Sequence, residues 1–284
     1  MLNRRLLLAG ALLPWVAPAA GAVPGFAALE QRAGGRVGVA ALDSGGGAPL
    51  GWRAHERFPM CSTFKLLAVA ALLARVDAAQ DTLARWIPYG EADLLEYAPI
   101  TRARRNEGGL TLGTLCEAAI RYSDNSAANL LLEALGGPPG VTAFARSLGD
   151  RITRLDRTEP QLNEALPGDV RDTTSPAAML GDLQQLLVNE VLSAAARARL
   201  TGWLCSSQVG AQLIRAGLPA HWSAGTKSGH GAHGAANDVA IIFPPQRAPL
   251  LLSIYTHGAR SSDSARDAVV AEAARLACAQ LTPH

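Results

Sequence analysis

Residues 62–76 read STFKLLAVAALLARV, an almost continuous run of apolar residues and strong helix formers. A run of this length without a polar face predicts a helix that is buried on all sides. Ser62 and Lys65 are three positions apart, so on a helix they share one face and the amine can reach the hydroxyl. This helix therefore places a nucleophile beside a potential base.

The rest of the chain contains strand-like stretches near both ends and a block of helices between them. Strand-like stretches occur at residues 36–42, 50–53, 222–226, 238–243 and 250–255. Helical periodicity appears at residues 112–121, 126–135, 139–148, 175–189 and 193–203, and a last helix begins after Ser262 and Asp263. This order predicts an α+β fold, with an antiparallel sheet formed by both chain ends, flanked by helices, and an all-helical lobe inserted between them.

The chain contains no repeat and no linker, so we expect one folded unit over residues 23–284. Its α/β lobe is predicted to comprise about residues 23–60 and 206–284, and its helical lobe about residues 61–205. Residues 150–174 are polar and show no periodicity. A structureless segment of that length predicts a functional loop.

Residues 1–22 have the composition of an export signal, with Arg4 and Arg5, an apolar run too short to span a bilayer, and then small residues. The arginine pair is compatible with the twin-arginine route. We expect a periplasmic protein without a membrane span. Without this segment the 26 basic residues fall to 24, equal to the 24 acidic residues. A balanced charge favours neither nucleic acid nor a membrane surface as a partner.

The cysteines and histidines predict no cross-link and no metal site. Four widely spaced cysteines in a domain of this size are expected to be buried free thiols: Cys61, Cys116, Cys205 and Cys278. His230 and His233 form the close pair among six histidines, but no acidic or cysteine ligand lies beside them in the sequence. We therefore expect no metal and no other cofactor.

Lysine occurs only twice in the chain, as Lys65 and Lys227, against 24 arginines. A guanidinium stays protonated, whereas an ammonium in a crowded, dry site can lose its proton and act as a base. Lys227 begins Lys227-Ser228-Gly229 at a predicted strand, where an ammonium could hold a carboxylate. Coding bias against lysine would explain the scarcity, but it would not explain why both lysines lie in motifs.

Two further motifs add polar side chains. Ser123-Asp124-Asn125 lies between two predicted helices, and Glu159 precedes Asn163 by four residues in the polar loop. Each motif also has a structural explanation, as a helix cap or a surface carboxylate, so none is specific alone. Together and in this order, the motifs predict an acyl-transfer site.

This set of motifs resembles that of the class A serine β-lactamases. The resemblance extends from about residue 35 to the C-terminus and includes Asn237-Asp238-Val239-Ala240. It implies that Ser62 is the acylated nucleophile and that Lys65 and Glu159 are the acid/base groups. It also implies that Ser123 protonates the leaving nitrogen and that Asn163 helps Glu159 to hold the hydrolytic water.

The same resemblance implies the groups that bind substrate. Tyr97 would lie at the mouth of the site, Asn125 would bind the side-chain amide of the substrate, and the backbone N–H groups of Ser62 and His230 would form the oxyanion hole. Lys227 and Ser228 would bind the substrate carboxylate. Residue 236, where some members have an arginine that assists this binding, is alanine. We expect Arg266 to replace that arginine, with His230 as the alternative.

The resemblance also implies a loop closed at its neck by an ion pair between Arg157 and Asp172. The implied function is hydrolysis of penicillins and cephalosporins, which are small-molecule substrates, by a monomer. The main alternative is a penicillin-binding D-Ala-D-Ala peptidase or a β-lactam sensor, which keeps the acyl group. Glu159 and Asn163 argue against both, because they supply a deacylating base. A non-catalytic β-lactam-binding module would need neither Ser123 nor two lysines.

Overall fold

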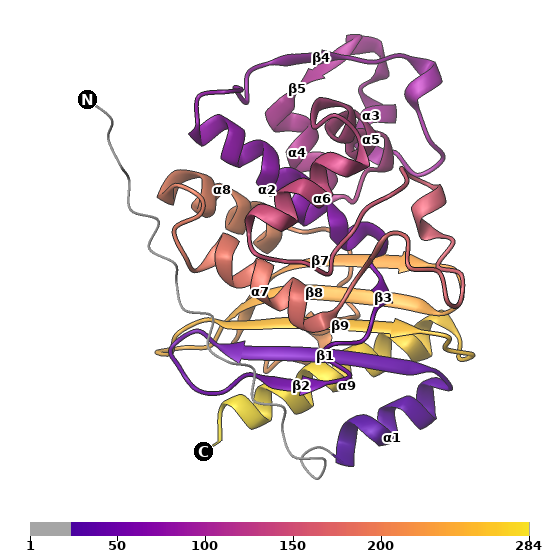
Figure 1. Ribbon diagram of the computed structural model, residues 1–284, viewed down its shortest axis with the longest axis vertical. Coiled ribbons are helices and arrows are strands. Elements are labelled where there is room, and N and C mark those ends of the chain that lie inside the picture. Colours follow the sequence, from indigo (N-terminus) through magenta and orange to yellow (C-terminus); the bar gives the residue numbers. More distant parts are fainter. Residues whose placement is uncertain (1–23, 284) are drawn as a thin grey trace.

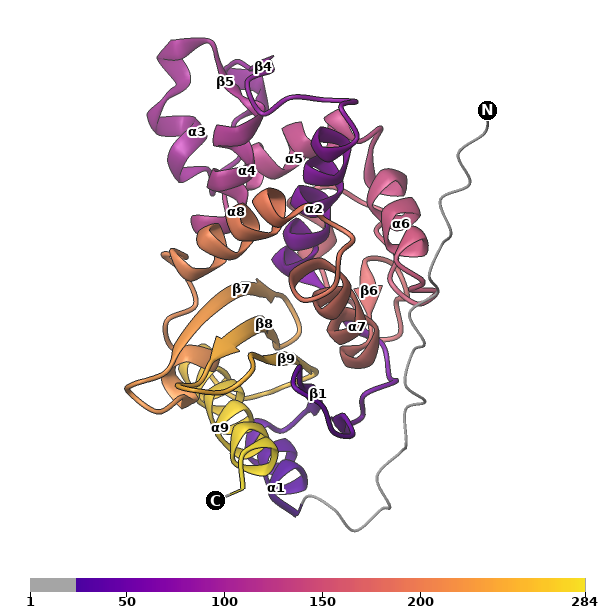
Figure 2. The ribbon, with the colours of Figure 1, turned by 90° about the vertical axis from the view of Figure 1, so that its left-hand side faces the viewer.

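A five-stranded antiparallel sheet lies between two layers of helices (Figures 1 and 2). The computed structural model describes residues 24–283, so the expected export signal at residues 1–22 lies outside the described residues. The sheet has the order β2-β1-β9-β8-β7. Its strands are β1 (Arg36–Asp43), β2 (Leu50–Trp52), β7 (Ser223–Gly231), β8 (Ala235–Phe243) and β9 (Leu250–His257). Both ends of the chain thus contribute strands, as the sequence predicts.

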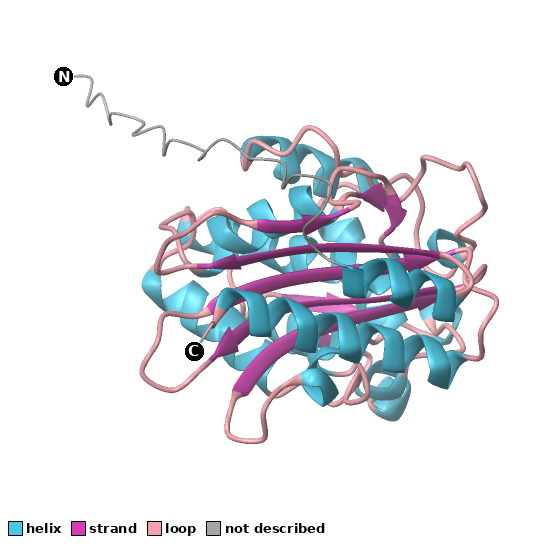
Figure 3. Ribbon diagram, turned by 90° about the horizontal axis from the view of Figure 1, so that it is seen from below, coloured by secondary structure: helices cyan, strands magenta, loops and turns pink. Residues whose placement is uncertain are grey.

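One face of the sheet is covered by α1 (Pro24–Ala33) and α9 (Asp263–Leu281), as Figure 3 shows from below. Val37 and Val39 of β1 pack with these helices, whereas Ala40 and Leu42 belong to the core on the opposite face. This division follows from the two-residue period of a strand. Helix α1 was not predicted. Ten residues make a marginal helix on their own, and contact with α9 and the sheet stabilises it.

The remaining helices lie on the other side of the sheet (Figure 2). They are α2 (Phe64–Asp77), α3 (Pro99–Ala103), α4 (Leu112–Arg121), α5 (Asn125–Ala134), α6 (Pro138–Ser147), α7 (Pro176–Leu187) and α8 (Ala194–Cys205). This part of the chain also contains two short strand pairs, which the sequence patterns did not predict. Those pairs are β4 (Trp86–Pro88) with β5 (Gly109–Thr111) and β3 (Phe58–Pro59) with β6 (Thr173–Thr174).

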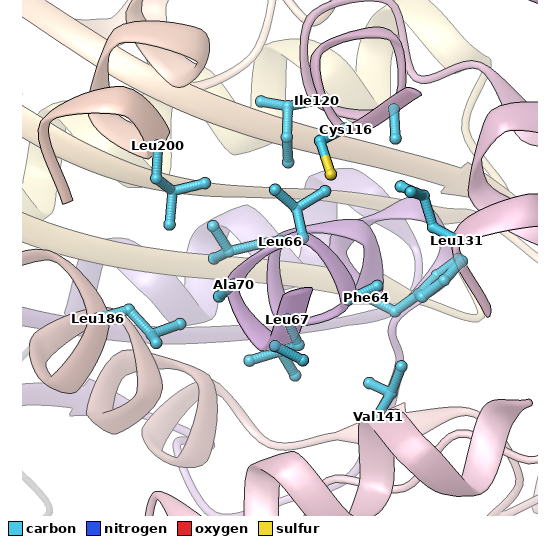
Figure 4. Close-up of a cluster of buried hydrophobic side chains, with 14 of the residues drawn as sticks. Phe64, Leu66, Leu67, Ala70, Cys116, Ile120, Leu131, Val141, Leu186 and Leu200 are labelled. Carbon is cyan, nitrogen blue, oxygen red and sulfur yellow. The ribbon is translucent and has the colours of Figure 1, made fainter. Parts of the chain in front are cut away.

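Helix α2 is the centre of this helical side. Every residue from Phe64 to Leu73 is buried, and α4, α5, α6 and α8 contact the helix. Figure 4 shows apolar side chains of α2 surrounded by residues of other helices, including Ile120, Leu131 and Leu186. Because neighbours surround the helix, its sequence needs no polar face. This burial fixes the element that carries Lys65.

Cys61, Cys116 and Cys278 are buried free thiols, as expected, whereas Cys205 is free but exposed at the end of α8. Within residues 24–283, no helix combines the length and the apolar character needed to cross a membrane.

Candidate active site

Ser62 lies in the 3-10 turn Cys61–Thr63, which leads directly into α2. Strand β7 passes very close to this turn, because a Cβ atom added at Gly229 would lie 2.9 Å from the backbone nitrogen of Ser62. Glycine at this position permits the approach. Asn237 on β8 donates a hydrogen bond of 2.9 Å to the carbonyl of Pro59, just ahead of the turn. The sheet and α2 therefore fix the nucleophile from two sides.

Lys65 is fully buried and follows Ser62 by three residues. Its ammonium lies 2.9 Å from Oε1 of Glu159 and donates to Oδ1 of Asn125 at 2.6 Å and to the carbonyl of Ser123 at 2.8 Å. Burial lowers the pKa of Lys65, and the neighbouring Glu159 carboxylate opposes this shift. An amine that loses its proton more easily is suited to proton transfer.

Glu159 lies in the 150–174 loop and is 2% exposed. Its Oε1 accepts a hydrogen bond of 3.2 Å from the Ser62 hydroxyl, and its Oε2 accepts one from the amide of Asn163. Among the described residues, Oδ1 of Asn163 is buried without a hydrogen-bond partner. Such an atom costs about 1–3 kcal/mol if it stays unsatisfied. The site therefore fits a water that donates to Asn163 and Glu159.

Asn129 of α5 fixes the backbone of Glu159, a contact that the sequence patterns did not predict. Its amide donates to the carbonyl of Glu159, and its side-chain oxygen accepts from the backbone nitrogen of Glu159, both at 2.9 Å. The available signal was an amide between the buried residues Ala128 and Leu130 of α5. A polar side chain in such a place needs a partner, here the neighbouring loop.

Ser123 lies between α4 and α5 with a left-handed φ of 56°. Its hydroxyl accepts a hydrogen bond of 3.0 Å from Lys227 and lies 3.4 Å from the amine of Lys65. Burial, together with the charge of Lys65, lowers the pKa of Lys227 well below its usual range. A hydroxyl between two amines can pass on a proton and regain one.

Strand β7 is longer than predicted, because it runs to Gly231 instead of ending at residue 226. Its glycines weaken the strand signal in the sequence, but pairing with β8 continues over the whole length of β7. Lys227, Ser228 and His230 therefore lie within the strand rather than beyond its end.

A cleft of about 470 Å³ opens at Ser62. Its lining comprises Ser62, Tyr97, Ser123, Asn125, Asn163, Val209, Gly210, Ser228, Gly229 and His230. The buried side chains of Lys65, Glu159 and Lys227 connect to this lining through the contacts above. No group of three or more histidine, cysteine or acidic side chains in residues 24–283 is arranged to hold a metal ion.

Comparison with known proteins identifies the family. A family model described as the β-lactamase enzyme family matches residues 25–281. β-Lactamase AST-1 of Nocardia asteroides is 48% identical over 261 residues, which cover 92% of this chain and 84% of that protein. The carbapenem-hydrolyzing β-lactamase KPC of Klebsiella oxytoca is 47% identical over 253 residues, which cover 89% of this chain and 86% of that protein. The structure of an ancestral class A β-lactamase, 54% identical, covers 89% of this chain and 97% of its own, with a TM-score of 0.88.

This chain belongs to the class A β-lactamase family.

Two residues were considered as the additional carboxylate anchor of this β-lactamase, and only one of them lines the cleft. Arg266 is not among the residues that line the cleft, and its guanidinium donates to Asp263 and to the carbonyl of Ser261. His230 does line the cleft, and its Nε2 lies 3.0 Å from a carboxylate oxygen of Asp267. The role expected for Arg266 thus has no support from its position.

The ion pair expected at the neck of the 150–174 loop is confirmed. Nε of Arg157 donates to Oδ2 of Asp172 at 2.6 Å, and a second arginine nitrogen binds Glu164. Oδ1 of Asp172 accepts from the backbone nitrogens of Asp156 and Arg157, at 2.8 and 2.9 Å. Both ends of the loop are therefore joined through one buried carboxylate.

Proposed function

We propose that the chain hydrolyses the β-lactam ring of penicillins and cephalosporins through an acyl-enzyme on Ser62. The observation that carries this proposal is the Glu159 carboxylate, which contacts the Ser62 hydroxyl with one oxygen and Asn163 with the other. A base in this place can accept the Ser62 proton during acylation and can then activate the water that hydrolyses the acyl-enzyme. This property separates a β-lactamase from a peptidase or sensor that stays acylated.

In the acylation step, Oγ of Ser62 attacks the carbonyl carbon of the ring while its proton passes to the Lys65–Glu159 pair. The backbone N–H groups of Ser62 and His230 stabilise the oxyanion. The carbon–nitrogen bond then breaks, and the Ser123 hydroxyl gives its proton to the departing nitrogen. A neighbouring lysine ammonium restores the Ser123 proton, because two amines lie within 3.4 Å of that oxygen. The product is an ester on Ser62.

In the deacylation step, a water between Glu159 and Asn163 attacks this ester. Glu159 takes one proton of the water, the new carbon–oxygen bond forms, and Ser62 leaves with a proton returned from the Lys65–Glu159 pair. The unsatisfied oxygen of Asn163 supports this position for the water.

We further propose that Lys227 and Ser228 bind the substrate carboxylate, that Asn125 binds the side-chain amide, and that Tyr97 contacts the substrate at the mouth. Tyr97 is 49% exposed and lines the cleft, which suits such a contact. All of these groups come from one chain, so a monomer suffices. Size-exclusion chromatography with light scattering tests this point.

Export to the periplasm is the proposed location, on the basis of the charged, apolar and small-residue order of residues 1–22. N-terminal sequencing of the protein from a periplasmic extract tests it. A mature chain that begins within about five residues of Ala22 is expected.

The experiment for the proposed function combines a chromogenic cephalosporin with intact-mass spectrometry. The unaltered protein should turn the substrate over steadily, whereas Glu159→Gln should accumulate an adduct on Ser62. Ser62→Ala, the matched control, should form no adduct. A single burst from the unaltered protein, or rapid turnover by Glu159→Gln, would overturn the assignment.

A further inference from the structure

A chain of hydrogen bonds connects the sheet to the 150–174 loop at a distance from the cleft. His257 is the last residue of β9, and only 7% of it is exposed. Its Nδ1 lies 3.2 Å from a guanidinium nitrogen of Arg36 on β1, and its Nε2 lies 2.8 Å from the carbonyl of Ala165. Ala165 follows Asn163 by two residues in the same loop.

The two partners of His257 determine its protonation state. A guanidinium only donates, so Nδ1 must accept, and a carbonyl only accepts, so Nε2 must carry the hydrogen. Burial, helped by the charges of Arg36 and His233 and opposed by the bond to Ala165, lowers the pKa of His257 and agrees with a neutral ring. The neutral ring thus bonds the sheet with one nitrogen and the loop with the other.

Arg36 is itself fixed, so His257 has a firm support. Arg36 binds Glu56 at 3.0 Å, and its guanidinium carbon lies 4.6 Å from the centre of the Phe58 ring. It also pairs within the sheet, where its backbone lies opposite His257 in the register of β1 and β9. Both residues therefore belong to the rigid part of the fold.

Ala165 is the point where this support meets the active site. Its φ is 49°, a left-handed conformation that an alanine keeps only when its surroundings hold it there. Its side chain packs with Cys61 and Ala235 in a small buried cluster. Cys61 precedes Ser62, so Ala165 links the loop that carries Glu159 to the turn that carries the nucleophile.

We propose that His257 is a positioning residue for the hydrolytic step. It holds Ala165 against Cys61 and thereby keeps Asn163 and Glu159 at the distance from Ser62 that attack by water requires. This inference rests on the proposed function, because it concerns the water step of that reaction. A displacement of about 1 Å can slow a reaction by roughly a hundredfold. The effect of a loosened loop should therefore be large on deacylation.

Two amide variants distinguish the hydrogen bond to Ala165 from the other contacts of the His257 side chain. His257→Gln places a donor at the depth of Nε2 and keeps an oxygen that can accept from Arg36. His257→Asn can still accept from Arg36, but its amide is one methylene too short to reach the carbonyl of Ala165. His221→Gln, at an exposed histidine before β7, is the control for replacing a histidine.

The measurements are the deacylation rate of a preformed acyl-enzyme, followed by intact mass, and the steady-state kcat and KM for the same cephalosporin. His257→Asn should deacylate roughly tenfold to a hundredfold more slowly, and its KM should fall with its kcat because acyl-enzyme accumulates. His257→Gln and His221→Gln should stay close to the unaltered protein. A merely destabilised variant would instead lose kcat at constant KM.

Equal rates for His257→Asn and the unaltered protein would overturn the proposal, and so would equal losses in the asparagine and glutamine variants. If the unaltered protein itself fails to deacylate, the proposed function fails instead. The two failures are therefore distinguishable.

Discussion

Replacing Asp172 by asparagine removes the charge that joins the two ends of the 150–174 loop. The side chain of Asp172 is 1% exposed and that of Arg157 is 15% exposed, so their ion pair is largely shielded from water. Breaking a buried pair from one side costs about 3–5 kcal/mol. Arg157 keeps Glu164 as a partner, which reduces the expected loss to about 2–4 kcal/mol. Asparagine tolerates the φ of 56° at this position. The loss of stability therefore measures the removal of the charge and not added backbone strain.

The assay is thermal unfolding together with the deacylation rate. A loss of this size in a chain of this length should lower Tm by roughly 4–7 °C, and the loosened loop should slow deacylation. Asp169→Asn is the matched control, because Asp169 pairs with Arg171 in the same loop, and the guanidinium side chain of Arg171 is 46% exposed. Exposed pairs contribute about 0–1 kcal/mol. An unchanged Tm for Asp172→Asn, or equal shifts in both variants, would refute this reasoning.

Two further predictions concern charge. Burial and the neighbouring Asp150 raise the pKa of Asp182 well above its usual range, so the folded state keeps a proton that the unfolded state loses above about pH 4. The free energy of unfolding should therefore fall as the pH rises towards the folded pKa, and Asp182→Asn should flatten this slope and stabilise the protein at pH 8 in urea titrations. Because His230 lines the cleft and Arg266 does not, His230→Ala should raise KM for cephalosporins in steady-state assays. Arg266→Ala should leave KM unchanged, and a rise in KM at every pH would instead restore the role expected for Arg266.

The main elements of the fold were predictable because each has a strong local signal. The helices at residues 112–121, 126–135 and 139–148 match α4, α5 and α6 to within one residue at each end. Helix α1 and the second half of β7 were missed for a shared reason. Short or glycine-rich segments have weak propensities of their own, and their structure comes from packing and pairing with distant parts of the chain.

The candidate site was predictable as a list of residues but not as an arrangement. Separate motifs identified Ser62, Lys65, Ser123, Glu159 and Lys227, whose side chains the structure joins through contacts of 3.4 Å or less. Asn129 and His257 were missed, because each acts through the backbone of a residue far away in sequence. No pattern within one segment records such a partner.

The backbone around the site explains why the remaining geometry has no sequence signal. Cys61, Ser123, Ala165 and Asp172 all have positive φ angles between 46° and 56°, although none of them is glycine. Each such conformation costs of order 1–3 kcal/mol and persists only under contacts from several elements. Asp172 is held by two backbone N–H groups and Arg157, and Ala165 by His257 and its apolar cluster. Because these supports come from the turn before α2, the loop and the sheet together, the active site exists only when the whole fold is assembled.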